Sequence, residues 1–152
     1  MLNKTVFIFM VCLTIYSCKK AEIPLLTSSN FPLKHQKVIT SIINNKNGTI
    51  SINYGNVAAL KVANEGTGKH LEGECYTLIT YKQKPMPHWY GTNMNSDILS
   101  VETVNIVQHK AGEISYAYKS KSYTEAGRPC RKENTLKRIK FIIGQPAAVL
   151  PN

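Results

Sequence analysis

The sequence predicts an all-β fold, an antiparallel β-sandwich of about seven strands in a single domain. Short runs of β-branched and aromatic residues recur between residues 38 and 143, at spacings of roughly ten residues. Turn-forming residues separate these runs, and no long stretch places its apolar residues at helical spacing. A sandwich is favoured over a barrel because inward faces rich in tyrosine and isoleucine fill a core and leave little room for a cavity.

The first predicted strands form a hairpin. Residues 38–43 are mostly β-branched and apolar, and the turn after them ends in Asn47-Gly48. Asn-Gly is the strongest short hairpin signal, because both residues tolerate a positive φ. Residues 49–54 then alternate cleanly between apolar and polar side chains, as a half-buried strand does.

The middle of the chain predicts two further strands. Residues 57–62 place Ala58, Leu60 and Val62 on one face of a strand, and a glycine-rich loop follows. Residues 74–81 carry apolar or aromatic side chains on both faces, which indicates a central strand covered on both sides or a strand at a partner interface. The segment 82–95 is expected to be irregular.

Three more strands complete the predicted sandwich. In residues 98–107 the apolar positions change parity, which a β-bulge near residues 102–103 would correct. Residues 114–119 alternate again, and a polar loop over residues 122–135 leads to a last strand at residues 139–143. The domain is expected to span residues 38–145, with a short tail at residues 146–152.

The N-terminus predicts an export signal. A short basic start containing Lys4 precedes an almost unbroken apolar run over residues 5–16, and the small residue Ser17 follows. This arrangement is typical of a secretory signal peptide at residues 1–17 and is too short to span a bilayer.

Cys18 refines that prediction. The segment Ile15-Tyr16-Ser17-Cys18 resembles a bacterial lipobox in the looser form common in Bacteroidetes. The resemblance implies that Cys18 is acylated and becomes the mature N-terminus, and several acyl chains would hold it stably on a membrane. Residues 18–37, which contain two prolines and no regular period, would then form the lipidated N-terminus and a flexible tether.

The resemblance also suggests which membrane holds the chain. Lys19, rather than the aspartate that retains enteric lipoproteins in the inner membrane, follows the cysteine, and Glu22 is the only acid nearby. The expected location is the outer membrane, facing the periplasm. An ordinary signal peptide on a secreted protein is the alternative.

The charge is strongly positive. Nineteen lysines and arginines face nine acids, which gives a formal net charge of +10. A basic surface suits phosphate-bearing lipid heads or an acidic partner protein. Nucleic acid is not expected as a partner, because the chain carries an export signal and no nucleic-acid-binding motif. A simple solvated basic surface is the alternative.

Besides the proposed lipid site Cys18, the mature chain keeps two cysteines, Cys75 and Cys130. In an oxidising compartment such a pair favours a disulfide. In the chain-entropy model, closing that loop would stabilise the fold by about 4 kcal/mol. Two separate buried thiols are the alternative.

The sequence does not predict an enzyme, a cofactor or a metal site. No phosphate-binding loop, nucleophile elbow or dinucleotide fingerprint occurs in the sequence. The histidines lie singly, so a metal site would need ligands from distant loops. These histidines are His35, His70, His88 and His109.

Two segments are candidate partner-binding surfaces. In residues 85–90 two prolines stiffen the segment, and apolar and aromatic side chains supply contact area of the kind enriched at binding hot spots; the candidates are Met86, His88, Trp89 and Tyr90. In the loop at residues 122–135 three cations lie beside Cys130 and suit acidic ligands; they are Arg128, Arg131 and Lys132. A plug at the end of a sandwich and a solvated loop are the respective alternatives.

Together these features predict a membrane-anchored envelope lipoprotein that acts as a non-enzymatic structural or interaction module and docks a periplasmic or secretion assembly through an envelope protein partner. In architecture alone it is similar to the outer-membrane lipoprotein of the type VI secretion membrane complex. The alternative is a small β-barrel that binds a hydrophobic or anionic ligand.

Overall fold

The structure, a computed structural model, describes Leu33 and residues 35–86, 88, 92–108, 113–123 and 135–148. This part of the chain forms one antiparallel sheet of five strands in the order β1-β2-β3-β4-β5, with two helices. The elements are β1 (Lys37–Asn44), β2 (Thr49–Gly55), α2 (Val57–Glu65), β3 (Cys75–Met86), β4 (Thr92–Gln108), β5 (Ile114–Ser122) and α3 (Thr135–Ile143).

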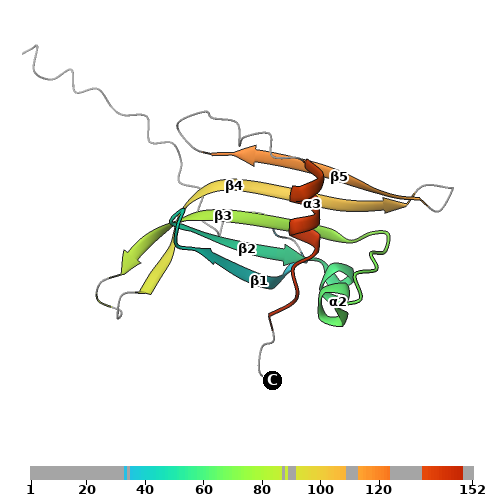
Figure 1. Cartoon of the computed structure of the whole chain (residues 1–152), viewed down its shortest axis with the longest axis horizontal. Coiled ribbons are helices and arrows are strands. Elements are labelled where there is room, and N and C mark those ends of the chain that lie inside the picture. The colour runs from blue at the N-terminus through green and yellow to red at the C-terminus, as the bar shows by residue number, and fades with distance from the viewer. Residues whose placement is uncertain are drawn as a thin grey trace, which may run out of the picture.

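Every strand pairs with its neighbour in sequence, so the sheet is an open meander (Figure 1). The predicted all-β antiparallel character is therefore confirmed for the sheet. The seven-stranded sandwich is wrong for the described residues, because two of the predicted strands are helices and the remaining five lie in one layer. The sheet is also not closed, which removes the barrel expected under the ligand-binding alternative.

The β1–β2 hairpin forms where the sequence predicts it. Gly48 has a φ of 60°, and its amide donates to the carbonyl of Asn45 at 3.4 Å. The side chain of Asn44 accepts from the amide of Asn47 at 3.1 Å. The glycine supplies the left-handed conformation that closes this turn without strain.

The predicted strand at residues 57–62 is the start of α2. Asn56 has an extended backbone, and its side-chain oxygen accepts from the amide of Ala59 at 3.0 Å, which is an N-cap. Ala59, Val62 and Ala63 are the buried residues of the helix, at spacings of three and four. In so short a run, the apolar residues fit both the alternating pattern of a strand and the spacing of a helix. The N-cap at Asn56 favours the helix.

The predicted last strand is α3. Its buried residues are Ile139, Ile142 and Ile143, again at helical spacing. The helix crosses the face of β3 and β4 in Figure 1. The side-chain amide of Asn53 on β2 donates to the carbonyl of Ile142 at 2.9 Å, so a buried polar group of the sheet satisfies the C-terminal end of the helix.

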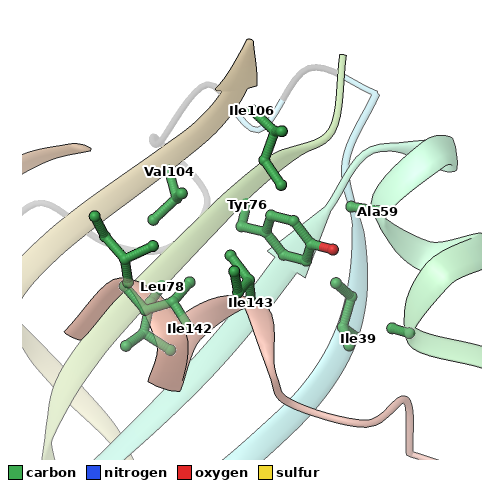
Figure 2. Close-up of a cluster of buried hydrophobic side chains, with 10 residues drawn as sticks. Ile39, Ala59, Tyr76, Leu78, Val104, Ile106, Ile142 and Ile143 are labelled. Carbon is green, nitrogen blue, oxygen red and sulfur yellow. The ribbon is translucent and has the colours of Figure 1, made fainter. Parts of the chain in front are cut away.

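The core on the helix side of the sheet surrounds Tyr76 (Figure 2). Its ring lies among side chains of the sheet and of both helices, and it is fully buried. The cluster comprises Ile39, Ala59, Ala63, Tyr76, Leu78, Val104, Ile106, Ile139, Ile142 and Ile143. Burying this apolar surface is the main force that holds the helices against the sheet.

A second cluster lies on the opposite face of the sheet. Its buried members are Ile79, Tyr81, Ile98 and Val101, with partly buried side chains that include Leu33 and Tyr123 packed against them. Apolar side chains are therefore buried on both faces of β3, as the sequence predicts for a central strand.

Along β4 the apolar residues change from odd-numbered to even-numbered positions because this strand, too, buries apolar side chains on both faces. Val101 is buried on one face and Val104 on the other, so no bulge is needed at residues 102–103, and the pairing is regular there. The register shifts instead near Tyr81. The segment 82–95, expected to be irregular, largely continues the β3–β4 pairing as far as Met86 and Thr92.

Ala147 and Ala148 pack back on the domain. The amide of Ala148 donates to the carbonyl of Ile39 at 2.7 Å, and that of Ala147 to Ala63 at 3.3 Å. The first residues of the expected tail therefore lie against β1 and α2. The structure describes no part of the predicted signal peptide, Cys18 or residues 19–32, which lie outside the described residues.

Candidate functional site

A buried carboxylate joins α3, β4 and β5. Glu102, with 2% of its surface exposed, accepts two hydrogen bonds from the Arg138 guanidinium, at 2.7 Å from Nε and 2.6 Å from Nη2. The hydroxyl of Tyr118 donates to the same carboxylate at 2.7 Å. Such a bidentate, charge-assisted pair fixes both position and orientation. It therefore locks α3 over the last two strands.

This network changes the acidity of Tyr118. Burial and the adjoining Glu102 carboxylate together raise the pKa of Tyr118 to about 12. A phenolate here would lose its donated hydrogen bond and face a carboxylate, so the neutral hydroxyl is favoured. The tyrosine is thus held as a hydrogen-bond donor.

A second buried carboxylate, Glu74, organises the loop before β3. Its Oε2 lies 2.9 Å from Nδ1 of His70 and accepts from the Tyr76 hydroxyl at 2.8 Å. The amide of Leu71 donates to its other oxygen. Burial raises the pKa of Tyr76, and the hydrogen bond to Glu74 adds to the effect.

Both carboxylates are occupied by bonds within the domain, which is the arrangement expected of groups that fix a fold. The His70 side chain is 13% exposed. The described residues contain no group of three histidine, cysteine or acidic side chains placed to hold a metal ion. Chemistry that needs a free carboxylate gains no support from these two clusters.

Cys75 is a free thiol in the structure, and its Sγ accepts a hydrogen bond from Nε2 of Gln36 at 3.2 Å. Burial raises the pKa of this thiol, which favours its protonated form. Cys130 lies outside the described residues. The Cys75–Cys130 disulfide therefore stays a prediction.

Of the predicted partner-binding residues, the structure describes Met86 and His88. Met86 ends β3, pairs with Thr92 and is partly buried, while His88 is exposed in the turn that follows. The remaining candidates lie outside the described residues; they are Trp89, Tyr90, Arg128, Arg131 and Lys132.

A surface that the sequence reasoning missed lies on β5. Among the described residues β5 pairs only with β4, so its other side is an edge of the sheet (Figure 1). Ile114 and Tyr116 are about two-fifths exposed, and Lys119 and Lys121 are exposed as well. We call residues 114–121 with their outward backbone groups the β5 edge.

The register shows which backbone groups face outward. The amide of Tyr123 donates to the carbonyl of Leu99 at 2.8 Å, and pairing continues from there without a register shift. The backbone groups of Tyr123 therefore point towards β4. Along an antiparallel strand the backbone groups of successive residues point alternately to one side and to the other, so those of Tyr116, Tyr118 and Ser120 point away from β4. They are free to pair with another extended segment.

The other edge of the sheet is less available. On β1 the register shifts between Val38 and Thr40, and the carbonyl of Ile39 already accepts from Ala148. A bulge and a covering segment are the means by which proteins protect an edge strand. The β5 edge, whose pairing with β4 is regular, is the better docking surface.

No protein-family model matches the chain, and a search of curated proteins finds no match. None of the helices in the described part of the chain has the length and apolar character needed to cross a bilayer.

Proposed function

We propose that this chain is a lipid-anchored envelope protein that acts as a docking module and not as an enzyme. Cys18 is the proposed point of attachment to the periplasmic face of the outer membrane, on the strength of the lipobox-like segment. The proposed partner is a protein of a periplasmic or secretion assembly. The similarity to the type VI secretion lipoprotein rested on a β-sandwich, which the described residues do not form, so this choice of assembly rests on the proposed anchor and tether alone.

One observation carries the docking role. The β5 edge combines a regular row of outward backbone groups with exposed apolar side chains, whereas both buried carboxylates are occupied by internal bonds. Strand edges bind extended segments through main-chain hydrogen bonds, and neighbouring side chains supply selectivity. Met86, His88, Trp89 and Tyr90 are proposed as additional contacts with the partner.

The anchor is tested by fractionation. Cys18→Ala should move the protein from the membrane pellet to the soluble fraction, because the acyl chains that hold it would be absent. Mass spectrometry of the native protein should find acyl groups on Cys18. A variant that stays in the membrane fraction contradicts the proposed attachment.

The docking role is tested by photo-crosslinking in cells. A benzoylphenylalanine in place of Tyr116, on the β5 edge, should give a discrete protein adduct. The same group in place of Val57, which is 74% exposed on α2, is the matched control and should give none. Equal adducts at both positions, or none at Tyr116, reject the β5 edge as the docking surface.

A further inference from the structure

We infer that the β5 edge accepts an acidic extended segment of a partner protein, in which acidic residues alternate with apolar ones, as a sixth strand of the sheet. The inference rests on the proposed docking function and names the chemistry of the partner.

The positive charge of the β5 edge lies on one face. Tyr118 points to the helix side of the sheet, where it contacts Glu102. Because side chains alternate along a strand, Lys119 and Lys121 lie on the opposite face. Their cross-strand neighbours on β4 are Thr103 and Val101, so no acid opposes either lysine from that strand.

The Lys121 ammonium is also held near the strand. Lys119 and Lys121 are two residues apart on the same face, and the Lys121 ammonium lies 4.8 Å from the centre of the Tyr123 ring. A cation–π contact of this kind limits the positions that the side chain samples. The lysines therefore present two charges at the spacing of alternate strand residues.

The pairing pattern sets the sequence of the added strand. Lys119 and Lys121 would lie in non-hydrogen-bonded pairs, in which facing side chains approach most closely. An antiparallel segment with acids two positions apart places one acid opposite each lysine. The residue between those acids lies opposite Ser120, on the helix face that Tyr116 and Tyr118 share.

The same lysines disfavour a second copy of this chain. Charged residues, lysine above all, are a common protection against pairing between edge strands. A strand that itself carries lysines adds like charges to the edge, whereas an acidic strand neutralises them. The net charge of +10 adds long-range attraction for an acidic partner and repulsion between copies.

The test uses the full chain in detergent and a fluorescent nine-residue peptide in which glutamates alternate with valines. The peptide should bind, measured by fluorescence anisotropy, and a peptide with lysines in place of the glutamates should not. Combining Lys119→Glu with Lys121→Glu should weaken binding about ten-fold or more. Combining Lys46→Glu with Lys61→Glu makes the same change of net charge at exposed sites on the β1–β2 turn and α2, and should change binding little.

A second measurement leaves the protein unaltered. N-methylation of alternate residues blocks one hydrogen-bonding edge of the peptide, so one methylation pattern should abolish binding and the other should not. Equal binding of both methylated peptides, or an equal effect of the two lysine pairs, overturns the inference. A concentration-dependent dimer that Ser120→Pro abolishes overturns it in favour of a second copy.

The two proposals fail separately. A protein adduct at Tyr116 without peptide binding keeps the docking function and rejects the acidic strand. Peptide binding without any adduct at Tyr116 in cells rejects the docking function.

Discussion

Arg138 of α3 and Glu102 of β4 form a bidentate ion pair in which the carboxylate is almost fully buried and the guanidinium is only partly so, with 3% and 24% of the side chains exposed. The two residues are 36 positions apart in the sequence. Their pairing ties α3 to β4, the strand beside the β5 edge.

Arg138→Ala should destabilise the domain by about 3 kcal/mol, because it leaves a buried carboxylate without its cation. The change is measured as the free energy of unfolding in urea. Lys140→Ala, at an exposed position of the same helix, is the matched control and should cost less than about 0.5 kcal/mol. Equal losses for the two variants would show that the ion pair contributes nothing particular.

Tyr118 should make stability fall at alkaline pH. Burial and Glu102 raise the pKa of Tyr118 to about 12, above its unfolded value near 10. The folded state therefore retains a proton that the unfolded state loses, so this contribution is complete below about pH 10 and disappears as the pH rises towards 12. The stability advantage of the wild type over Tyr118→Phe should narrow across that window. A constant difference between the two proteins from pH 9 to 12 would contradict the assignment.

Asn56→Ala should cost about 1–2 kcal/mol, in the upper range for loss of an N-cap. The side chain serves three backbone groups at once: it accepts from Ala59 at 3.0 Å and Cys75 at 3.2 Å and donates to Gly73 at 2.7 Å. Thermal unfolding measures the loss. Asn64→Ala, exposed within α2, is the control and should be neutral or slightly stabilising, because alanine is the better helix former. If Asn56→Ala left the thermal stability unchanged, the N-cap would not be the reason that α2 forms.

Gly55→Ala should destabilise the domain by about 1–3 kcal/mol through overpacking. A methyl group at this position would lie 2.5 Å from Cδ1 of Ile39 and 2.8 Å from Cβ of Ala59. Ile39→Val removes that Cδ1 atom, so the double variant should lose less than the sum of the single losses. Additive losses in a double-mutant cycle would show that the two sites do not touch.

Three of the five strands, β1, β2 and β5, follow closely from the sequence, whereas β3 and β4 extend into residues expected to be irregular. Alternation at residues 49–54 and 114–119 and the Asn47-Gly48 turn correspond to β2, β5 and the hairpin that opens the sheet. The sequence predicted strands where α2 and α3 form, because nine residues are too few to separate helical from alternating periodicity. Asn56 was the available signal for α2, since asparagine before an apolar run is a helix start.

The candidate surface was harder to predict. Each lysine of β5 is visible in the sequence, but exposure of the strand depends on which strands lie at the edges of the sheet. The Glu102–Arg138 pair depends likewise on how α3 docks, because no local pattern relates residues so far apart. The partner-binding role of all seven candidate residues stays a prediction, and five of them lie outside the described residues: Trp89, Tyr90, Arg128, Arg131 and Lys132.

The sequence by itself determined that this chain is rich in antiparallel strands, where most of them begin and end, and that both faces of the strand after residue 74 are apolar. These properties are local, since they follow from alternation and turn chemistry. The tertiary structure decided that the strands form one open layer, that two apolar runs are helices, and that β5 presents a basic edge. Those outcomes depend on which surfaces cover one another. The burial of one segment against a distant one cannot be predicted from any single stretch of residues.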